Sequence, residues 1–310
     1  MKPFNLTVMM YHYVRDPGDA AEAGSGIPGL PRQIFETQLD HLMHRYTLIA
    51  WPALRQFLLE DEPLSPAACL LTFDDGVCDH YLNVYPALQA RGLSGLFFAL
   101  ARTSEERLAL GHKIHFLLAK LGLNILREEI WLRLTAEQRI PYHQAEEKYR
   151  TQYADLDVFK AILQRELSIE AEPILSGLFE ETIGSEVETT RNYYLTPTQI
   201  AEMSAAGMYF GGHSHSHPWL DWVSSDVQVA EIKASATHLQ TIEPGPWAFA
   251  YPYGGLSEAL PETLKANQFA AAFTTKTQTY HTDPFYIGRL DGEALSPAWP
   301  DASLIMGVAS

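Results

Sequence analysis

The sequence predicts an α/β fold built on a parallel sheet. Short, mainly apolar runs recur along the chain and are typical of strands that are buried on both faces: Leu6–Tyr11, Tyr46–Ala50, Cys69–Phe73, Leu96–Leu100, Met208–Gly212, Trp247–Tyr251, Ala270–Thr274 and Tyr286–Leu290. Helical patterns separate several of these runs: Phe35–His44, Tyr81–Arg91, Thr196–Ala206, Ser225–Thr241 and Ser257–Asn267. Strands that alternate with helices form parallel sheets, and about seven or eight such units are enough to close a barrel.

One long segment, residues 103–190, departs from this alternation. It contains no strand-like run and is rich in charged residues. Leucine and isoleucine recur within it at helical spacing, in Ile114–Leu123, Ile125–Leu134 and Leu156–Leu167. We therefore predict a single domain over residues 1–310 that carries a helical insertion at about 103–190.

Composition narrows the classes of partner. The 22 basic and 38 acidic residues give a net charge of −16, which repels phosphate backbones and anionic lipids, so we expect no nucleic acid partner. No run of about 18 apolar residues is present, so we expect no membrane span. We see no secretory signal, and the two cysteines, Cys69 and Cys78, suit a reducing compartment. A cytoplasmic location is the expectation, and the oligomeric state is open.

Two adjacent carboxylates follow one of the predicted strands. Asp74 and Asp75 stand directly after the run Cys69–Phe73, at the end of a parallel strand where active sites form. An Asp-Asp-Gly turn that caps the next helix is the simpler interpretation of this segment alone. A catalytic or metal site at this position therefore needs further residues from a second segment.

A histidine-rich segment supplies that partner. His213, His215 and His217 follow the predicted strand Met208–Gly212, at the same edge of the sheet as the aspartates. A solvated polar loop is the alternative interpretation. Two imidazoles and one carboxylate suit zinc, cobalt or iron and leave coordination positions open for water and substrate. Both segments together favour a site for a divalent transition metal, with zinc as the first choice.

These segments resemble the first two motifs of the polysaccharide deacetylase family (carbohydrate esterase family 4, NodB-homology fold). Phe249–Gly254 is similar to the third motif, and Met10–Val14 is of the kind that opens longer members. The resemblance covers roughly residues 6–100 and 193–292. It implies a distorted (β/α) barrel of about seven parallel strands, to which the helical insertion is added.

The resemblance also implies roles for individual residues. Asp74 would be the catalytic base, and Asp75, His213 and His217 would hold the metal ion. A backbone N–H at Tyr253, in the third motif, would hold the developing oxyanion together with the metal. Beside Tyr253, Pro252 and His12 are the further candidate residues for contact with the substrate.

The sequence departs from the family pattern at two places. Many members have an arginine in the third motif that pairs with the catalytic aspartate, and here that position is Ala250. We predict that Arg289 replaces it, although a surface salt bridge is the alternative for this residue. Many members also have a general acid in a Leu-x-His motif near the C-terminus, which His281 does not match. His12, His215 and solvent are the remaining candidates for the acid.

The predicted function is metal-dependent hydrolysis of an N-acetyl or O-acetyl group on a carbohydrate. The expected substrate is an acylated sugar or glycan, and the expected location favours a nucleotide- or lipid-linked precursor in surface-glycan synthesis. A deformylase or another non-peptide amidase is one alternative, because the motifs specify hydrolysis but not the acyl group. A non-catalytic sugar-binding protein is the other, and the pair of carboxylates argues against it.

Overall fold

The structure is a computed structural model of the chain and describes residues 3–16 and 26–295. Every strand pair in its main sheet is parallel, and seven strands follow one another in the order β10-β2-β4-β5-β6-β7-β8. β3 pairs with the first half of β4. The strands of this sheet are β2 (Thr7–Tyr11), β3 (Thr47–Ile49), β4 (Ala68–Phe73), β5 (Leu96–Ala99), β6 (Tyr209–Gly212), β7 (Trp247–Ala250), β8 (Phe269–Phe273) and β10 (Leu290–Asp291). A separate antiparallel pair joins β1 (Phe4–Asn5) to β9 (Tyr280–His281).

The main sheet curls into a distorted barrel, because one segment connects its two edges. Ile287 forms a parallel bridge to Phe273 in β8, and Leu290 pairs with Met9 in β2. The fold class expected from the sequence, a distorted (β/α) barrel of about seven parallel strands, is confirmed.

The strand predicted at Tyr286–Leu290 is wrong in its extent. Only Leu290–Asp291 is a strand, and Arg289 precedes it instead of lying within it. The backbone changes partner here, since Ile287 exchanges hydrogen bonds with β8 whereas Arg289 N–H donates to the Lys276 carbonyl. A Cβ at Gly288 would lie 2.4 Å from that same carbonyl oxygen, so the chain approaches too closely for regular pairing.

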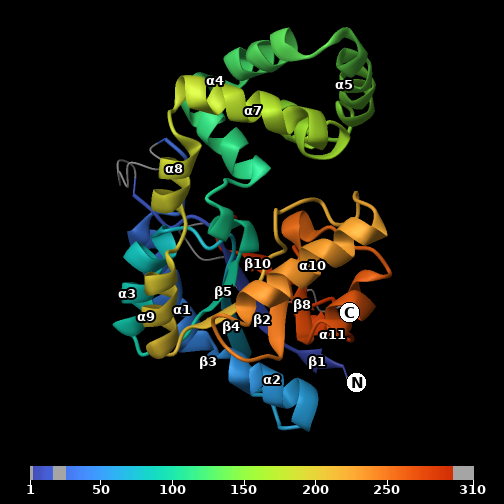
Figure 1. Cartoon of the computed structure of the whole chain (residues 1–310). Helices are drawn as coiled ribbons and strands as arrows, with labels where there is room; N and C mark the ends of the chain where they lie inside the picture. Colours follow the sequence, from blue (N-terminus) through green and yellow to red (C-terminus); the bar gives the residue numbers. More distant parts are fainter. Residues whose placement is uncertain (1–2, 17–25, 296–310) are drawn as a thin grey trace.

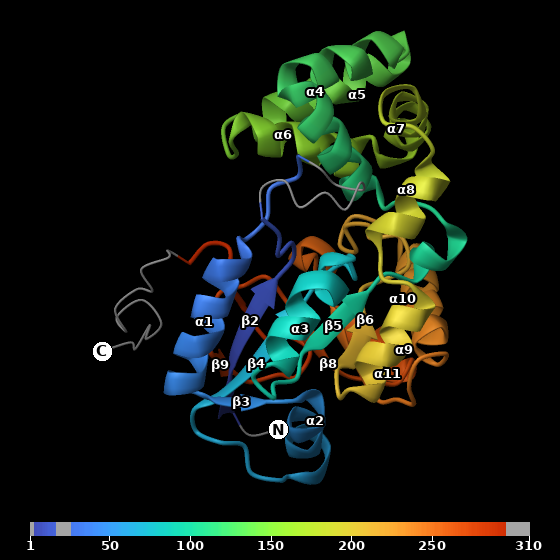
Figure 2. The same cartoon turned by 90° about the vertical axis from the view of Figure 1, so that its left-hand side faces the viewer.

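Helices cover the outer face of the sheet (Figures 1 and 2). They are α1 (Arg32–Arg45), α3 (Tyr85–Gln89), preceded by the π-helical turn η1 (His80–Val84), α9 (Pro197–Ala205), α10 (Ser225–Leu239) and α11 (Leu260–Ala266). Thr196 starts α9 with a capping box, in which its side chain accepts from the Gln199 N–H and the Gln199 side chain accepts from the Thr196 N–H. Ser224 is the N-cap of α10, without a side-chain cap hydrogen bond.

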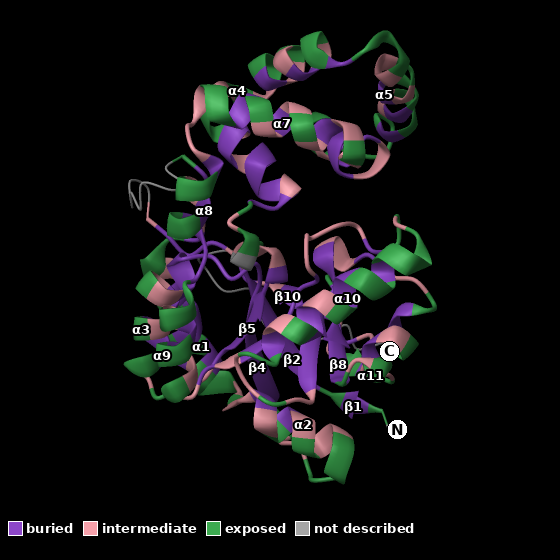
Figure 3. Ribbon diagram, in the orientation of Figure 1, coloured by how far each residue is buried: buried purple, intermediate pink, exposed green. Residues whose placement is uncertain are grey.

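Alternate residues of the strands belong to two separate cores. Met9 and Tyr11 of β2 pack with the outer helices, whereas Leu6 and Val8 face the barrel interior. The short helix α2 (Trp51–Glu60) adds Trp51 to the interior core and closes the end of the barrel where the strands begin. Figure 3 shows that β2, β4, β5 and β8 are buried along their length, which explains why they appear in the sequence as mainly apolar runs.

The segment between β5 and β6 is helical, and no strand occurs in it. It begins with the 3-10 turn η2 (Ala101–Glu105) and contains α4 (Leu110–Arg133), α5 (Ala136–Tyr149), α6 (Asp155–Ala161), the π-helical turn η3 (Ile162–Glu166), α7 (Ser168–Thr182) and α8 (Glu186–Tyr193). Figure 2 shows β2 running toward these helices, which lie beyond the carboxyl ends of the strands. Their core includes Tyr13, Val77 and Leu100 from the barrel rim, so the insertion packs on the rim. The division of the chain into one domain with an insertion stays a prediction.

Two further observations concern the cysteines and the lengths of the helices. Cys69 and Cys78 are both buried and form no disulfide. None of the helices in the described part of the chain has the length and hydrophobicity of a membrane span.

Candidate active site

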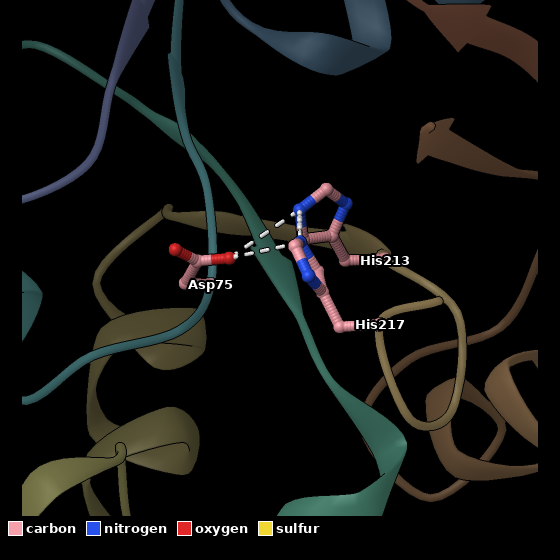
Figure 4. Close-up of side chains that lie close together, drawn as sticks. All are labelled: Asp75, His213 and His217. Carbon is pink, nitrogen blue, oxygen red and sulfur yellow. Dashed lines mark hydrogen bonds and ion pairs between the residues drawn. The ribbon is translucent and has the colours of Figure 1, made fainter. Parts of the chain in front are cut away.

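Two loops at the carboxyl end of the sheet carry the candidate metal ligands. Asp75 follows β4, and His213 and His217 follow β6. β5 lies between β4 and β6, so the two loops meet over its end. Figure 4 shows the three side chains pointing toward one another. Among the residues that the structure describes, they form the group whose ligand atoms lie close enough together to hold one ion.

The three ligand atoms form a nearly equilateral triangle. Asp75 Oδ1 lies 3.4 Å from the Nε2 atoms of both His213 and His217, and the two Nε2 atoms are 3.1 Å apart. A tetrahedral zinc ion with ligand distances of about 2.0–2.1 Å separates its ligands by about 3.3 Å, so the triangle matches such an ion. Asp75 Oδ1 is buried and has no hydrogen-bond partner in the described structure. The donor set therefore fits zinc, and it also suits cobalt or iron.

Hydrogen bonds hold the ring of His213 and the backbone of His217, whose ring Nδ1 has no partner in the described structure. His213 Nδ1 donates to the carbonyl oxygen of Ala250 at 2.7 Å, which leaves Nε2 as the unprotonated, ligating nitrogen. The His217 N–H donates to Ser214 Oγ at 3.0 Å. Burial holds the pKa of His217 well below its usual range, so its imidazole is neutral as a ligand requires.

Backbone strain is concentrated at this site. Of the seven non-glycine residues with positive φ in the described structure, four belong to the candidate motifs: Asp75 (76°), Ser214 (65°), His217 (63°) and Tyr253 (55°). Such conformations cost about 1–3 kcal/mol each and persist where the surrounding structure imposes them. The fold therefore holds these side chains in directions that an unstrained loop would not give.

Arg289 lies against Asp74. Its Nη1 and Nη2 atoms donate to the two carboxylate oxygens of Asp74, each at 2.7 Å, and both side chains are buried. Nε of Arg289 donates to the Thr274 carbonyl at 3.0 Å, which fixes the plane of the guanidinium. Burial raises the pKa of Asp74, but the charge on Arg289 opposes it, and this pKa lies below its usual value. The predicted contact is present, and a surface salt bridge is excluded.

Asp74 and the three candidate ligands form the floor of a pocket of about 500 Å³, and Arg289 is not part of its lining. His12 lines it, and its Nε2 lies 3.8 Å from Asp74 Oδ2. Tyr253 also lines it and stacks on Trp219, with ring centroids 4.5 Å apart and an angle of 11° between the planes. Pro252, by contrast, is buried at the start of the 3-10 turn η4 (Pro252–Gly254) and is not part of the lining. Pro252 therefore shapes the turn and does not contact the cavity.

The structure separates the candidate acids. His12 reaches the pocket, whereas His215 does not line it and instead pairs with Glu105, Nε2 to Oε1 at 3.4 Å. His281 is buried under the amino-terminal end of the chain, where its Nε2 lies 2.9 Å from the carbonyl oxygen of Leu6. Of the histidines considered from the sequence for this role, only His12 faces the pocket.

The insertion contributes several pocket residues that sequence reasoning missed. His112 and His115 come from the start of α4, and Lys160, Gln164 and Arg165 come from α6 and η3. His112 lies closest to the candidate ligands, with its Nε2 atom 3.1 Å from Asp75 Oδ2. The only signal in the sequence is a pair of histidines one turn apart in a helical pattern, and that pattern does not show where the helix docks.

A sequence model described as "Polysaccharide deacetylase" matches residues 180–272, which include His213, His217 and Tyr253. The match is narrower than the resemblance noted from the motifs, since Asp74 and Asp75 lie outside it. A putative polysaccharide deacetylase of Bacillus subtilis, YxkH, is 28% identical over 115 residues, or 37% of this chain and 36% of that protein. The chain thus matches about a third of the length of this relative.

Solved structures of deacetylases share the fold. The deacetylase PplD of Streptococcus pyogenes, solved with acetate, has a TM-score of 0.59 at 18% identity, and 96% of each chain is covered. A de-N-acetylase from Aggregatibacter actinomycetemcomitans gives 0.59 at 16% identity, with 94% of this chain and 96% of that chain covered. IcaB from Ammonifex degensii gives 0.54 at 17%, with 93% and 91% covered.

The chain is thus similar to polysaccharide deacetylases in sequence over part of its length and to solved deacetylases in fold. The likeness in fold extends over the insertion as well, since up to 96% of the chain is covered. At these low identities it concerns the backbone and does not transfer a substrate.

Proposed function

We propose that this protein removes an acetyl group from the nitrogen of an acetylated sugar in a metal-dependent hydrolysis, with an O-acetyl group as a further possible target. One observation carries the proposal: a carboxylate clamped by arginine, Asp74, stands beside the triangle of metal-ligand atoms at the floor of a pocket. The match to the polysaccharide deacetylase family and the names of the similar proteins support the carbohydrate part of the proposal.

Asp75, His213 and His217 would hold the ion, for which zinc is the first choice. A divalent ion held there supplies an activated water molecule and polarises the carbonyl of the acetyl group, so that no enzyme nucleophile is needed. The metal dependence and the identity of the ion are both part of this proposal.

The chain's own residues move the protons. Asp74 accepts a proton from the attacking water, and Arg289 keeps the carboxylate ionised and directed into the pocket. His12 donates a proton to the leaving nitrogen, because it faces the same space and stands 3.8 Å from Asp74. The backbone N–H of Tyr253 assists the developing oxyanion. The flat faces of Trp219 and Tyr253 offer a surface for the sugar ring.

The test is a screen for acetate release from N-acetylated and O-acetylated sugars, with formate release from formylated analogues measured in parallel. The Asp74→Asn variant should lose about 10²–10⁴-fold in turnover and still bind zinc, since it removes the base and leaves the three ligands in place. Asp226→Asn, at an exposed aspartate in the first turn of α10, is the matched control and should be unchanged.

Each outcome assigns a function. Formate release without acetate release would favour the deformylase alternative. Tight sugar binding without any hydrolysis, in a protein loaded with zinc or cobalt, would favour the sugar-binding alternative. Against that alternative, a binding protein has no need of a buried carboxylate and guanidinium beside its ligand, because burying an ion pair is unfavourable without a role for it.

A further inference from the structure

His112, at the start of α4, contacts the candidate metal ligand Asp75 from the insertion. Its Nε2 atom lies 3.1 Å from Asp75 Oδ2, and the two side chains are 3% and 7% exposed. The converging triangle uses the other oxygen, Oδ1, so His112 lies outside the set of atoms that would surround the ion. No motif of the sequence analysis includes this residue.

The hydrogen-bond partners of His112 show which of its ring nitrogens donates. A carboxylate oxygen can only accept, so Nε2 of His112 donates to Asp75 Oδ2. The other ring nitrogen, Nδ1, lies 2.5 Å from the hydroxyl oxygen of Tyr194 and accepts from that hydroxyl. The Tyr194 oxygen also accepts from the Ala109 N–H at 3.1 Å.

This hydrogen bond selects the carboxylate oxygen that is left for the ion. Asp75 has a positive φ of 76°, so its side chain leaves the backbone in an unusual direction and needs a partner to hold it. His112 occupies Oδ2, and Oδ1 stays without a partner in the described structure, facing the nitrogens of His213 and His217. We propose that His112 is a positioning residue that the insertion supplies to the barrel, and that it sets the affinity of the site for its metal ion.

Both ends of the insertion hold His112 in place. Ala109 and His112 come from its beginning, whereas Tyr194 follows α8 at its end, and the Tyr194 hydroxyl joins the two. The neighbouring Gly111 lies against the third motif, since a Cβ there would stand 2.6 Å from the hydroxyl oxygen of Tyr253. Binding of the ion and docking of the insertion are therefore coupled, and each stabilises the other. The inference rests on the proposed function only in placing a divalent ion at the triangle.

The experiment measures zinc affinity of the full chain by competition with a chromophoric chelator. His112→Phe keeps a ring but removes the donor, and it should weaken zinc binding about 10–100-fold, the usual effect of losing such an outer partner. His112→Gln, whose amide still donates, should recover part of the loss. Tyr194→Phe removes the donor that fixes the tautomer and should weaken binding less. His143→Phe changes an exposed histidine of the same insertion, 61% exposed, and should have no effect.

A second readout tests the coupling itself. Zinc should slow hydrogen exchange of the amides around Ala109–Lys113 in the wild-type chain, and this protection should be lost in His112→Phe. The unfolding temperature of each metal-free variant establishes whether it is folded, and His112→Gln replaces His112→Phe if the latter is not.

The outcomes separate this inference from the proposed function. Wild-type zinc affinity in a folded His112→Phe or His112→Gln protein would overturn the positioning role alone. Weaker zinc binding in these variants, in a chain that releases no acetate from any sugar, would support the positioning role and contradict the proposed activity. A wild-type chain that binds neither zinc, cobalt nor iron would refute both.

Discussion

Replacing Arg289 with methionine tests the clamp on Asp74 directly. The Arg289 side chain is fully buried and makes two charge-assisted hydrogen bonds to Asp74, each of which contributes about 1.5–3 kcal/mol. Their sum, about 3–6 kcal/mol, agrees with the roughly 3–5 kcal/mol lost when one partner of a buried ion pair is removed. We expect Arg289→Met to lower the free energy of unfolding by about 3–5 kcal/mol at pH 7, measured by urea denaturation of the metal-free protein.

The effect has a definite dependence on pH. In the wild-type protein the pKa of Asp74 is lowered, so its contribution to stability is present above the unfolded pKa of about 3.9 and is lost as the pH falls through the folded value. Without Arg289, burial dominates and the folded pKa lies above the unfolded one. The destabilisation is then largest at neutral pH and decreases as Asp74 is protonated. The stability difference between variant and wild type should therefore narrow toward pH 4.

The same variant should alter catalysis. The acid limb of the pH–rate profile should move upward, because a higher pH is needed to ionise Asp74, and Arg289→Lys should restore only part of the turnover since it lacks the bidentate fork. The double variant Arg289→Met with Asp74→Asn is the control for stability, because it removes both charges together. Its free energy of unfolding, relative to wild type, should depend less on pH than that of Arg289→Met. A stability loss below about 1 kcal/mol, or one that is equal at pH 4 and pH 7, would refute this reasoning.

Three further predictions concern other parts of the chain. Elemental analysis should find one transition metal ion per chain, and His217→Ala should lose both the ion and the activity; a variant that keeps the ion would remove His217 from the ligand set. His12→Gln should reduce turnover by about 10²–10⁴-fold with unchanged zinc affinity, and wild-type turnover would leave the proton donor to solvent. Lys113 is fully buried between Glu172 and Glu186, at 2.8 and 3.1 Å. Lys113→Met should lower the free energy of unfolding by about 3–5 kcal/mol at pH 7. Burial raises the pKa of Glu172, but the charge on Lys113 opposes it and the pKa is lowered on balance. The contribution of this ion pair to stability should therefore be lost below about pH 4.3. A stability difference between Lys113→Met and wild type that does not narrow there would contradict the prediction.

The barrel could be predicted because its strands are buried on both faces. Leu96–Leu100 is apolar at every position and Cys69–Phe73 at every position but Thr72, which indicates burial and places the following residues at the carboxyl edge. The segment Tyr286–Leu290 is also buried, although it contains Gly288 and Arg289, but it changes hydrogen-bond partner within five residues. Hydrophobicity reports burial and not pairing, so its short strand was not predictable.

The metal triangle and the clamp were also accessible from the sequence. Asp75, His213 and His217 are placed by strand ends, whose position in a parallel sheet is known before the structure is. Arg289 was inferred because few cations follow the third motif and the other two, Lys265 and Lys276, fall in a helix and a loop. In both cases the inference used positions fixed by the barrel.

His112 was inaccessible for the opposite reason. Its role depends on how α4 docks on the barrel rim, and that docking is decided by contacts between segments far apart in the sequence, such as Tyr13 with Tyr193. Helical periodicity identifies which side of α4 is buried but not what it is buried against. The same argument applies to Lys160 and Arg165, which line the pocket from α6 and η3.

The floor and the wall of the pocket therefore have different roles in the proposed reaction. The floor, made by barrel loops, contains the groups that act on the acetyl group: Asp74, which Arg289 clamps, and the triangle around Asp75. The wall, made by the insertion, presents Lys160 and Arg165 to whatever lies beyond the acetyl group. Since a fold can keep its chemistry while its loops change the substrate, the insertion is the part of this chain in which substrate choice should be sought. The hydrogen bond from His112 to Asp75 also couples the insertion to the metal site. A substrate that displaces the insertion from the barrel would therefore weaken the hold on the metal ion.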